Sequence, residues 1–184
     1  MSETKSNMNP LGFRAPEFKL LDVVSEKLLS LENLLSEKAT VIMFICNHCP
    51  FVKHVNTQLV SMANDYMPKG VSFIAINSND VNNYPEDSPE KMKKLGEFLR
   101  YPFPYLFDET QETAKAYDAA CTPDFYIFDG DGICVYRGQL DNSRPGNGKP
   151  VTGKDMRSAL DNILAGKKIN TPQKPSIGCN IKWK

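Results

Sequence analysis

Residues 41–52 read VIMFICNHCPFV, an apolar run of strand length that continues into a Cys-x-x-Cys pair. Beyond Pro50 the apolar residues recur at helical spacing. This order predicts a buried strand that ends at two thiols and leads directly into a helix. Pro50 suits the first position of that helix, because the N–H group that proline lacks would have no partner there. We therefore expect Cys49 at the N-cap and Cys46 one loop further back.

The expected position of Cys49 favours a reactive thiolate. Unpaired backbone N–H groups and the positive end of the helix dipole stabilise the anion at a helix N-terminus. The thiolate is the form that attacks disulfides and binds metals. We interpret Cys49 as a nucleophile and Cys46 as the thiol that resolves it in a reversible disulfide, provided that the loop lets the two sulfurs meet. The alternative for Cys49 is a small buried hydrophobe, as most free cysteines are.

Composition and charge limit the classes of function. The chain has 184 residues, enough for one domain with a sizeable core, with 41% hydrophobic and 24% charged residues. Lys and Arg equal Asp and Glu at 22 each, so neither nucleic acid nor a membrane surface is an expected partner. No apolar run approaches the ~18 residues of a transmembrane helix, and the polar start lacks a signal-peptide core. We therefore expect a cytoplasmic protein that needs no cofactor.

The five cysteines are an odd count on a chain that is too large to need disulfides for its stability. An odd count in a reducing compartment indicates catalytic, metal-binding or inert thiols. The cysteines lie at positions 46, 49, 121, 134 and 179.

The remaining sequence predicts alternating strands and helices, hence an α/β fold with a mixed central sheet and helices on both faces. A hairpin precedes the core, and a second hairpin follows it. Residues 1–15 are interpreted as a loosely laid arm, and 167–184 as a tail without clear periodicity. We expect strands at 16–22, 28–30, 40–45, 71–76, 105–107, 125–129 and 133–137. We also expect a short helix capped by Ser30 and longer helices that begin at Pro50 and at Ser88. Two further helices begin at an Asp108–Gln111 capping box and at a Thr152 cap, and the last of them ends at Leu164.

Five motifs carry a resemblance to a known family: APEF at 15–18, CNHCPFVK at 46–53, CTPDF at 121–125, YRG at 136–138 and SIGCNIKW at 176–183. With the order of elements, they resemble the thioredoxin fold and, within it, the peroxiredoxin-like (AhpC/TSA-type) redoxins, a bacterial group of poorly defined activity. The resemblance covers roughly residues 10–184. It implies a single thioredoxin-like domain over 1–184 with an N-terminal hairpin extension.

The resemblance also implies which cysteine is the nucleophile. In thioredoxins the nucleophile lies five residues after a strand Phe, and in peroxiredoxins it directly precedes Pro, so both patterns select Cys49. The second thioredoxin cysteine falls on Val52, and the peroxiredoxin hydroxyl residue falls on Cys46.

Thr122-Pro123 is similar to the cis-proline loop of thioredoxins, which lies against the active-site sulfur and offers the backbone of its first residue to a partner peptide. The arginine that stabilises the peroxidatic thiolate of peroxiredoxins falls on Pro123. This departure favours disulfide exchange over peroxide reduction.

Other candidates each have two interpretations. His48 would lower a neighbouring thiol pKa as imidazolium, or act as a base or ligand, or simply fill the turn. His54 reads more readily as an ordinary helix residue. We interpret Cys121 as a third redox thiol, as a ligand or as a residue that only fills the core, and Cys134 as a structural residue. Cys179 reads more readily as a docked tail residue than as a distant resolving thiol.

Three functions stay open. In a thiol-disulfide oxidoreductase, Cys49 attacks a protein or small-molecule disulfide, Cys46 releases the product, and an external thiol restores the enzyme. In an antioxidant thiol peroxidase, a peroxide oxidises Cys49 to a sulfenic acid, and Cys46, Cys121 or Cys179 resolves it. In a binding module, copper(I) or zinc is held by Cys46, Cys49 and Cys121 with one of the histidines.

Overall fold

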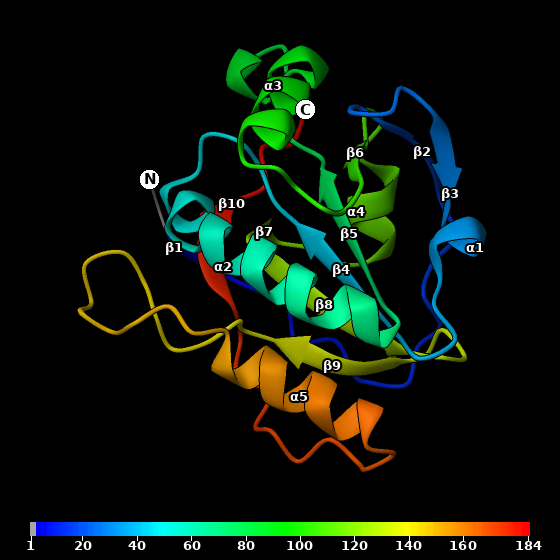
Figure 1. The fold of residues 1–184 in the computed structure, drawn as a ribbon. Coiled ribbons are helices and arrows are strands. Elements are labelled where there is room, and N and C mark those ends of the chain that lie inside the picture. Colours follow the sequence, from blue (N-terminus) through cyan, green and yellow to red (C-terminus); the bar gives the residue numbers. More distant parts are fainter. Residues whose placement is uncertain (1–2) are drawn as a thin grey trace.

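The computed structural model describes residues 3–184 and confirms the mixed central sheet (Figure 1). Strands β4, β5 and β6 are parallel to one another, β8 pairs antiparallel with β4 and forms a hairpin with β9, and the N-terminal hairpin β2–β3 extends the other edge. The order across the sheet is β3-β2-β6-β5-β4-β8-β9. The strands are β2 (Lys19–Asp22), β3 (Leu28–Ser30), β4 (Ala39–Phe44), β5 (Val71–Asn77), β6 (Tyr105–Phe107), β8 (Asp124–Asp129) and β9 (Cys134–Gly138).

Helices cover both faces of this sheet, because β4 carries apolar side chains on both of its faces and every one of its residues is buried. One apolar cluster joins the sheet to α2 and α5, and a second joins the other face to α1 and α4. Figure 1 shows α2 in front of the strands and α5 below β9. The helices are α1 (Leu31–Leu34), α2 (Pro50–Tyr66), α3 (Pro89–Phe98), α4 (Glu112–Ala116) and α5 (Lys154–Leu164), with short 3₁₀ turns η1 (Met67–Lys69) and η2 (Pro85–Asp87).

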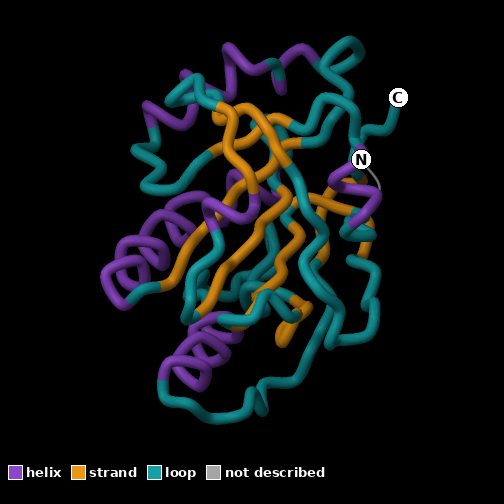
Figure 2. The backbone as a smooth tube through the Cα atoms, turned by 90° about the vertical axis from the view of Figure 1, so that its right-hand side faces the viewer, coloured by secondary structure: helices purple, strands orange, loops and turns teal. Residues whose placement is uncertain are grey.

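A second, three-stranded sheet lies beside the first. Its order is β1 (Glu3–Lys5), β10 (Ile177–Asn180) and β7 (Cys121–Thr122), and all its pairs are antiparallel. After α5 a long loop leads back along the molecule to β10 (Figure 2). The second sheet thus places the C-terminal strand directly against the segment that precedes Pro123.

The second sheet corrects two sequence-based expectations. The loosely laid arm is wrong for residues 3–5, which form β1, while residues 1–2 lie outside the described residues. The tail contains a buried strand although it has no periodicity, because the pairing of β10 with β7 and β1 comes from segments distant in sequence.

Two helix starts also differ from expectation. Gly153, with φ +69°, is the N-cap of α5 in place of Thr152, whose hydroxyl accepts only the Lys154 N–H at 3.2 Å. The capping box is displaced as well: Gln111 is the N-cap of α4 in a left-handed conformation. The buried Asp108 carboxylate accepts hydrogen bonds from the N–H groups of Thr113 and Ala114 in the first turn of α4, at 3.3 and 2.9 Å.

Among the residues that the structure describes, no helix combines the length and apolar character that a membrane crossing requires.

Candidate active site

The site is built around the loop between β4 and α2. Cys49 is the N-cap of α2 and Pro50 occupies its first turn, as the sequence predicts. The Cys49 carbonyl accepts the N–H groups of Val52 and Lys53 at 3.1 and 3.0 Å, which fixes the start of the helix. The Cys49 sulfur faces the residue that precedes Pro123.

The loop between β7 and β8 touches both thiols of the Cys-x-x-Cys pair. The Thr122–Pro123 peptide bond is cis, as the resemblance implies. Cys49 Sγ lies 3.4 Å from the Thr122 carbonyl oxygen, and Cys46 Sγ lies 3.3 Å from Thr122 Oγ1. The cis-proline loop is therefore in direct contact with the predicted nucleophile.

The two thiols of the pair have opposite acidities. A hydrogen bond from Cys46 lowers the pKa of Cys49 to about 5, against the effect of burial, and backbone N–H groups of Val52 and Cys179 add to the lowering. The same hydrogen bond, together with burial, raises the pKa of Cys46 well above its ordinary value. At neutral pH the pair therefore holds one proton, on Cys46, and Cys49 is a thiolate.

His48 lies at the rim of the site and is held by a carboxylate that sequence reasoning missed. Its Nδ1–H donates to Asp87 Oδ2 at 2.5 Å, and its ring stacks on Tyr84 with an interplanar angle of 9°. The hydrogen bond to Asp87 and the charges of Asp87 and Cys49 raise the pKa of His48, although burial opposes the shift. His48 is thus favoured as an imidazolium beside the thiolate.

Asp87 is fully buried and has several hydrogen-bond partners. Besides His48, it accepts the Asn47 N–H at 2.7 Å and the side-chain amides of Asn77 and Asn79 at 3.2 and 3.0 Å. Burial alone would raise the pKa of Asp87, but hydrogen bonds from His48 and Asn79 lower it below its usual value. Asp87 lies in the polar insert of residues 81–87, where no motif marks it in the sequence.

Cys179 is the third thiol at the site. It is buried on β10, and its Sγ lies 2.7 Å from Cys49 Sγ. Burial and the neighbouring Cys49 thiolate raise the pKa of Cys179 to about 12, so Cys179 is the hydrogen-bond donor of this contact. The sequence identified Cys179 but placed it at a distance from Cys49, because the pairing of β10 with β7 leaves no local signal.

The other candidates lie outside this group of contacts. Burial raises the pKa of Cys121, whose Sγ is 3.6 Å from the Pro123 carbonyl oxygen. Burial raises the pKa of Cys134, on the edge strand β9, to about 12. His54 points its Nε2 into the interior, where this atom has no hydrogen-bond partner among residues 3–184.

The metal-site hypothesis receives no support. Within residues 3–184, a single group of potential ligands lies within 4.8 Å, Cys46, His48 and Asp87, and it omits Cys49, Cys121 and His54. Asp87 is already saturated by hydrogen bonds.

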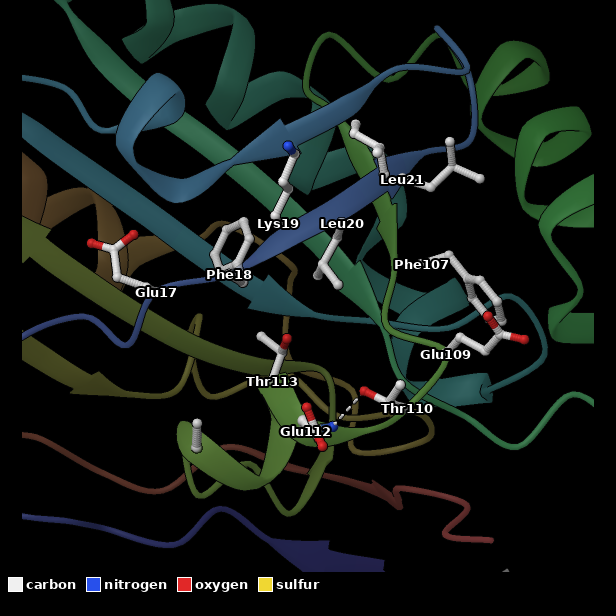
Figure 3. Close-up of a pocket in the computed structure, with 12 residues that line it drawn as sticks. Glu17, Phe18, Lys19, Leu20, Leu21, Phe107, Glu109, Thr110, Glu112 and Thr113 are labelled. Atoms are coloured by element: carbon white, nitrogen blue, oxygen red, sulfur yellow. Dashed lines mark hydrogen bonds between the residues drawn. The ribbon is translucent and has the colours of Figure 1, made fainter.

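A groove of about 620 Å³ lies at the other edge of the sheet and is lined by residues in and beside β2, β6 and α4, including Phe18, Leu20 and Thr113 (Figure 3). None of the candidate residues lines this groove, so it is not part of the site.

Comparisons with known proteins support the family and the fold. The model of the AhpC/TSA family matches residues 11–137. An uncharacterised conserved protein from Geobacillus kaustophilus is 68% identical, with a TM-score of 0.99 over 100% of this chain and 97% of that one. A hypothetical protein from Sinorhizobium meliloti is 47% identical, with a TM-score of 0.96 over 98% of each chain. No curated protein matches.

A more distant neighbour supports the thioredoxin-like fold alone. The thiol:disulfide interchange protein of the thioredoxin family from Chlorobium tepidum is 16% identical, with a TM-score of 0.62 over 85% of this chain and 99% of that one.

Proposed function

We propose that this chain, which belongs to the AhpC/TSA family, is a thiol-dependent oxidoreductase that exchanges disulfides through Cys49. The observation that carries the proposal is the state of Cys49: a sulfur at a helix N-terminus, with its pKa lowered to about 5, in contact with a cis-proline loop and a second thiol. A thiolate at neutral pH is the form that attacks a disulfide.

In the proposed reaction, the Cys49 thiolate attacks one sulfur of a protein or small-molecule disulfide. A mixed disulfide forms on Cys49, and the other half of the substrate leaves as a thiolate. The His48 imidazolium, held by Asp87, stabilises negative charge at the rim of the site. A second thiol of the protein then displaces the remaining half, and an external thiol reductant returns the protein to its reduced form. The prediction that Cys46 is this second thiol stays open here.

Access to Cys49 requires movement, because the side chain is 0% exposed. The segments that cover it include β10 and the 121–123 loop, whose atoms lie 2.7 and 3.4 Å from the sulfur. A disulfide substrate therefore reaches Cys49 only after local displacement of a covering segment, and turnover is expected to be slower than the low pKa alone would allow.

The test is an insulin-reduction assay with dithiothreitol as the reductant. Cys49→Ser should reduce insulin no faster than dithiothreitol alone, whereas wild type and Cys134→Ser should accelerate the reaction equally. Cys134 is the matched control, because it is a buried cysteine on β9 away from the contacts of Cys49. Equal rates for wild type and Cys49→Ser would refute the proposal.

A thiol peroxidase is the second candidate, and the burial of Cys49 favours it, because a peroxide needs less room than a disulfide. Cys49 would take one oxygen of the peroxide, become a sulfenic acid and release an alcohol or water. This reaction is tested by rapidly mixing reduced protein with hydrogen peroxide and measuring the rate at which the Cys49 thiol is lost. A rate constant no greater than that of free cysteine would dismiss this reaction.

A further inference from the structure

We propose that Cys179 is the thiol that closes the disulfide with Cys49, so that the redox pair joins the start of α2 to the C-terminal strand. This inference rests on the proposed function and names the resolving residue at the same site. It gives Cys46 a different task, that of the hydrogen-bond donor to the Cys49 thiolate.

Strand pairing fixes the position of Cys179. In the register of the second sheet, Cys179 pairs with Thr122, the residue that precedes the cis-proline. Gly178 makes this approach possible, because a Cβ at that position would lie 2.0 Å from the Thr122 carbonyl oxygen. The Ser176 hydroxyl donates to the Pro123 carbonyl at 2.7 Å and so ties the start of the strand to the same loop.

The chain after Cys179 is held equally firmly. The Ile181 N–H donates to the Ala120 carbonyl at 3.1 Å, and the Lys182 N–H donates to Asn79 Oδ1 at 2.9 Å. On the outer side, β1 pairs with β10 along its length. Strand β10 is therefore a fixed part of the site. Its contacts with β7 on one side and β1 on the other hold Cys179 beside the sulfur of Cys49.

The two sulfurs are already close to bonding distance. Cys49 Sγ and Cys179 Sγ are 2.7 Å apart, and a disulfide bond needs about 2.05 Å, so bond formation requires a shift of less than about 1 Å. Cys46 Sγ lies 3.3 Å from Thr122 Oγ1, and its S–H donates a hydrogen bond to Cys49. A thiol that stabilises the thiolate by donating to it is best suited to remain protonated.

The acidity of Cys179 changes during the reaction. Burial, together with the hydrogen bond and charge of the Cys49 thiolate, keeps Cys179 protonated. Once Cys49 is in a mixed disulfide it carries no charge, so its contribution disappears, while the nearby Lys182 ammonium continues to favour the Cys179 thiolate. The first step of the reaction therefore lowers the pKa of Cys179, although its burial remains.

In the resolving step Cys179 Sγ bonds to Cys49 Sγ, the bond between Cys49 and the substrate sulfur breaks, and the Cys179 proton ends on the released substrate thiol. Over both steps the sulfurs of Cys49 and Cys179 are oxidised by two electrons and one substrate disulfide is reduced. One half of the substrate leaves as a thiol, and the other leaves as a thiolate that takes its proton from solvent.

The test is disulfide mapping of reduced protein after reaction with one equivalent of glutathione disulfide, alkylation and tryptic digestion without reduction. Cys46 and Cys49 share the tryptic peptide 39–53, while Cys179 lies in 169–182, so the two pairings give different products. We expect 39–53 cross-linked to 169–182 in wild type, in Cys46→Ser and in the Cys134→Ser control. Cys179→Ser should instead accumulate glutathione on Cys49.

Each alternative result has a defined meaning. A disulfide within 39–53 as the main product in wild type would overturn the inference and leave the proposed function standing. A lasting glutathione adduct on Cys49 in wild type would do the same, because no thiol would then resolve it. Unmodified Cys49 would refute the proposed function itself. The wild-type map decides without any variant, and circular dichroism verifies that each variant is folded.

Discussion

Replacing Cys46 with alanine should raise the pKa of Cys49. The hydrogen bond from Cys46 is the main cause of the low pKa, which is about 5 in the native protein. A hydrogen bond to a charged group contributes about 1.5–3 kcal/mol. One pKa unit corresponds to about 1.4 kcal/mol. The pKa of Cys49 should therefore rise by about 1–2 units in Cys46→Ala and by less in Cys46→Ser, which keeps an O–H donor.

The assay is the thiolate absorbance near 240 nm, titrated with pH and corrected with Cys49→Ser. At pH 6, a pKa of about 5 leaves roughly nine-tenths of Cys49 ionised, and a rise of about 1–2 units reduces this to between one-half and one-tenth. Cys134→Ala is the control and should keep the wild-type midpoint. An unchanged midpoint in Cys46→Ala would refute the assignment of Cys46 as the donor.

The same shift links stability to pH. Because the pKa of Cys49 is lower in the folded chain, about 5, than the ~8.5 of an unfolded thiol, the folded state binds fewer protons between these values. The stabilisation is fully present above the unfolded pKa and is lost as the pH falls towards about 5. Urea unfolding should thus show stability rising with pH over this window in wild type and rising less in Cys49→Ala.

Three further predictions concern the surroundings of the site. Asp87→Asn should lower the pKa of His48, measured by NMR titration of the imidazole, and an unchanged value would contradict the role of this carboxylate. Arg137→Met should destabilise the fold by roughly 3–5 kcal/mol in urea, because it leaves the buried Asp124 without its ion-pair partner; a loss below 1 kcal/mol would argue against this pair. Gly178→Ala should force β10 away from β7 and reduce the yield of the Cys49–Cys179 disulfide, and a wild-type yield would contradict the close approach.

The core of the site was predictable because its signals are local. The apolar run before Cys46, the proline after Cys49 and the helical spacing beyond it lie in a single stretch of chain. They correctly predict β4, the start of α2 and the N-cap position of Cys49. The cis peptide at Pro123 followed from the resemblance to a family, since nothing in the residues alone distinguishes it from a trans bond.

The features that the sequence did not predict depend on contacts between distant segments. Asp87 reaches His48 across 39 positions, and β10 reaches β7 across more than 50, so neither leaves a periodic pattern. The cap of α4 was misplaced because Gln111 adopts a left-handed conformation that its residue type does not signal. The sequence pointed to Cys49 as the candidate nucleophile, and only the pairing of distant strands places Cys179 beside it.

The most direct measurement of the central claim is the site of glutathione attachment in a variant that has no resolving thiol. In Cys46→Ser/Cys179→Ser, glutathione disulfide at neutral pH should modify Cys49 and leave Cys121 and Cys134 unmodified, as read by peptide mass spectrometry. Attachment at Cys121 or Cys134, or none at Cys49, would contradict the assignment of Cys49 as the redox-active thiolate.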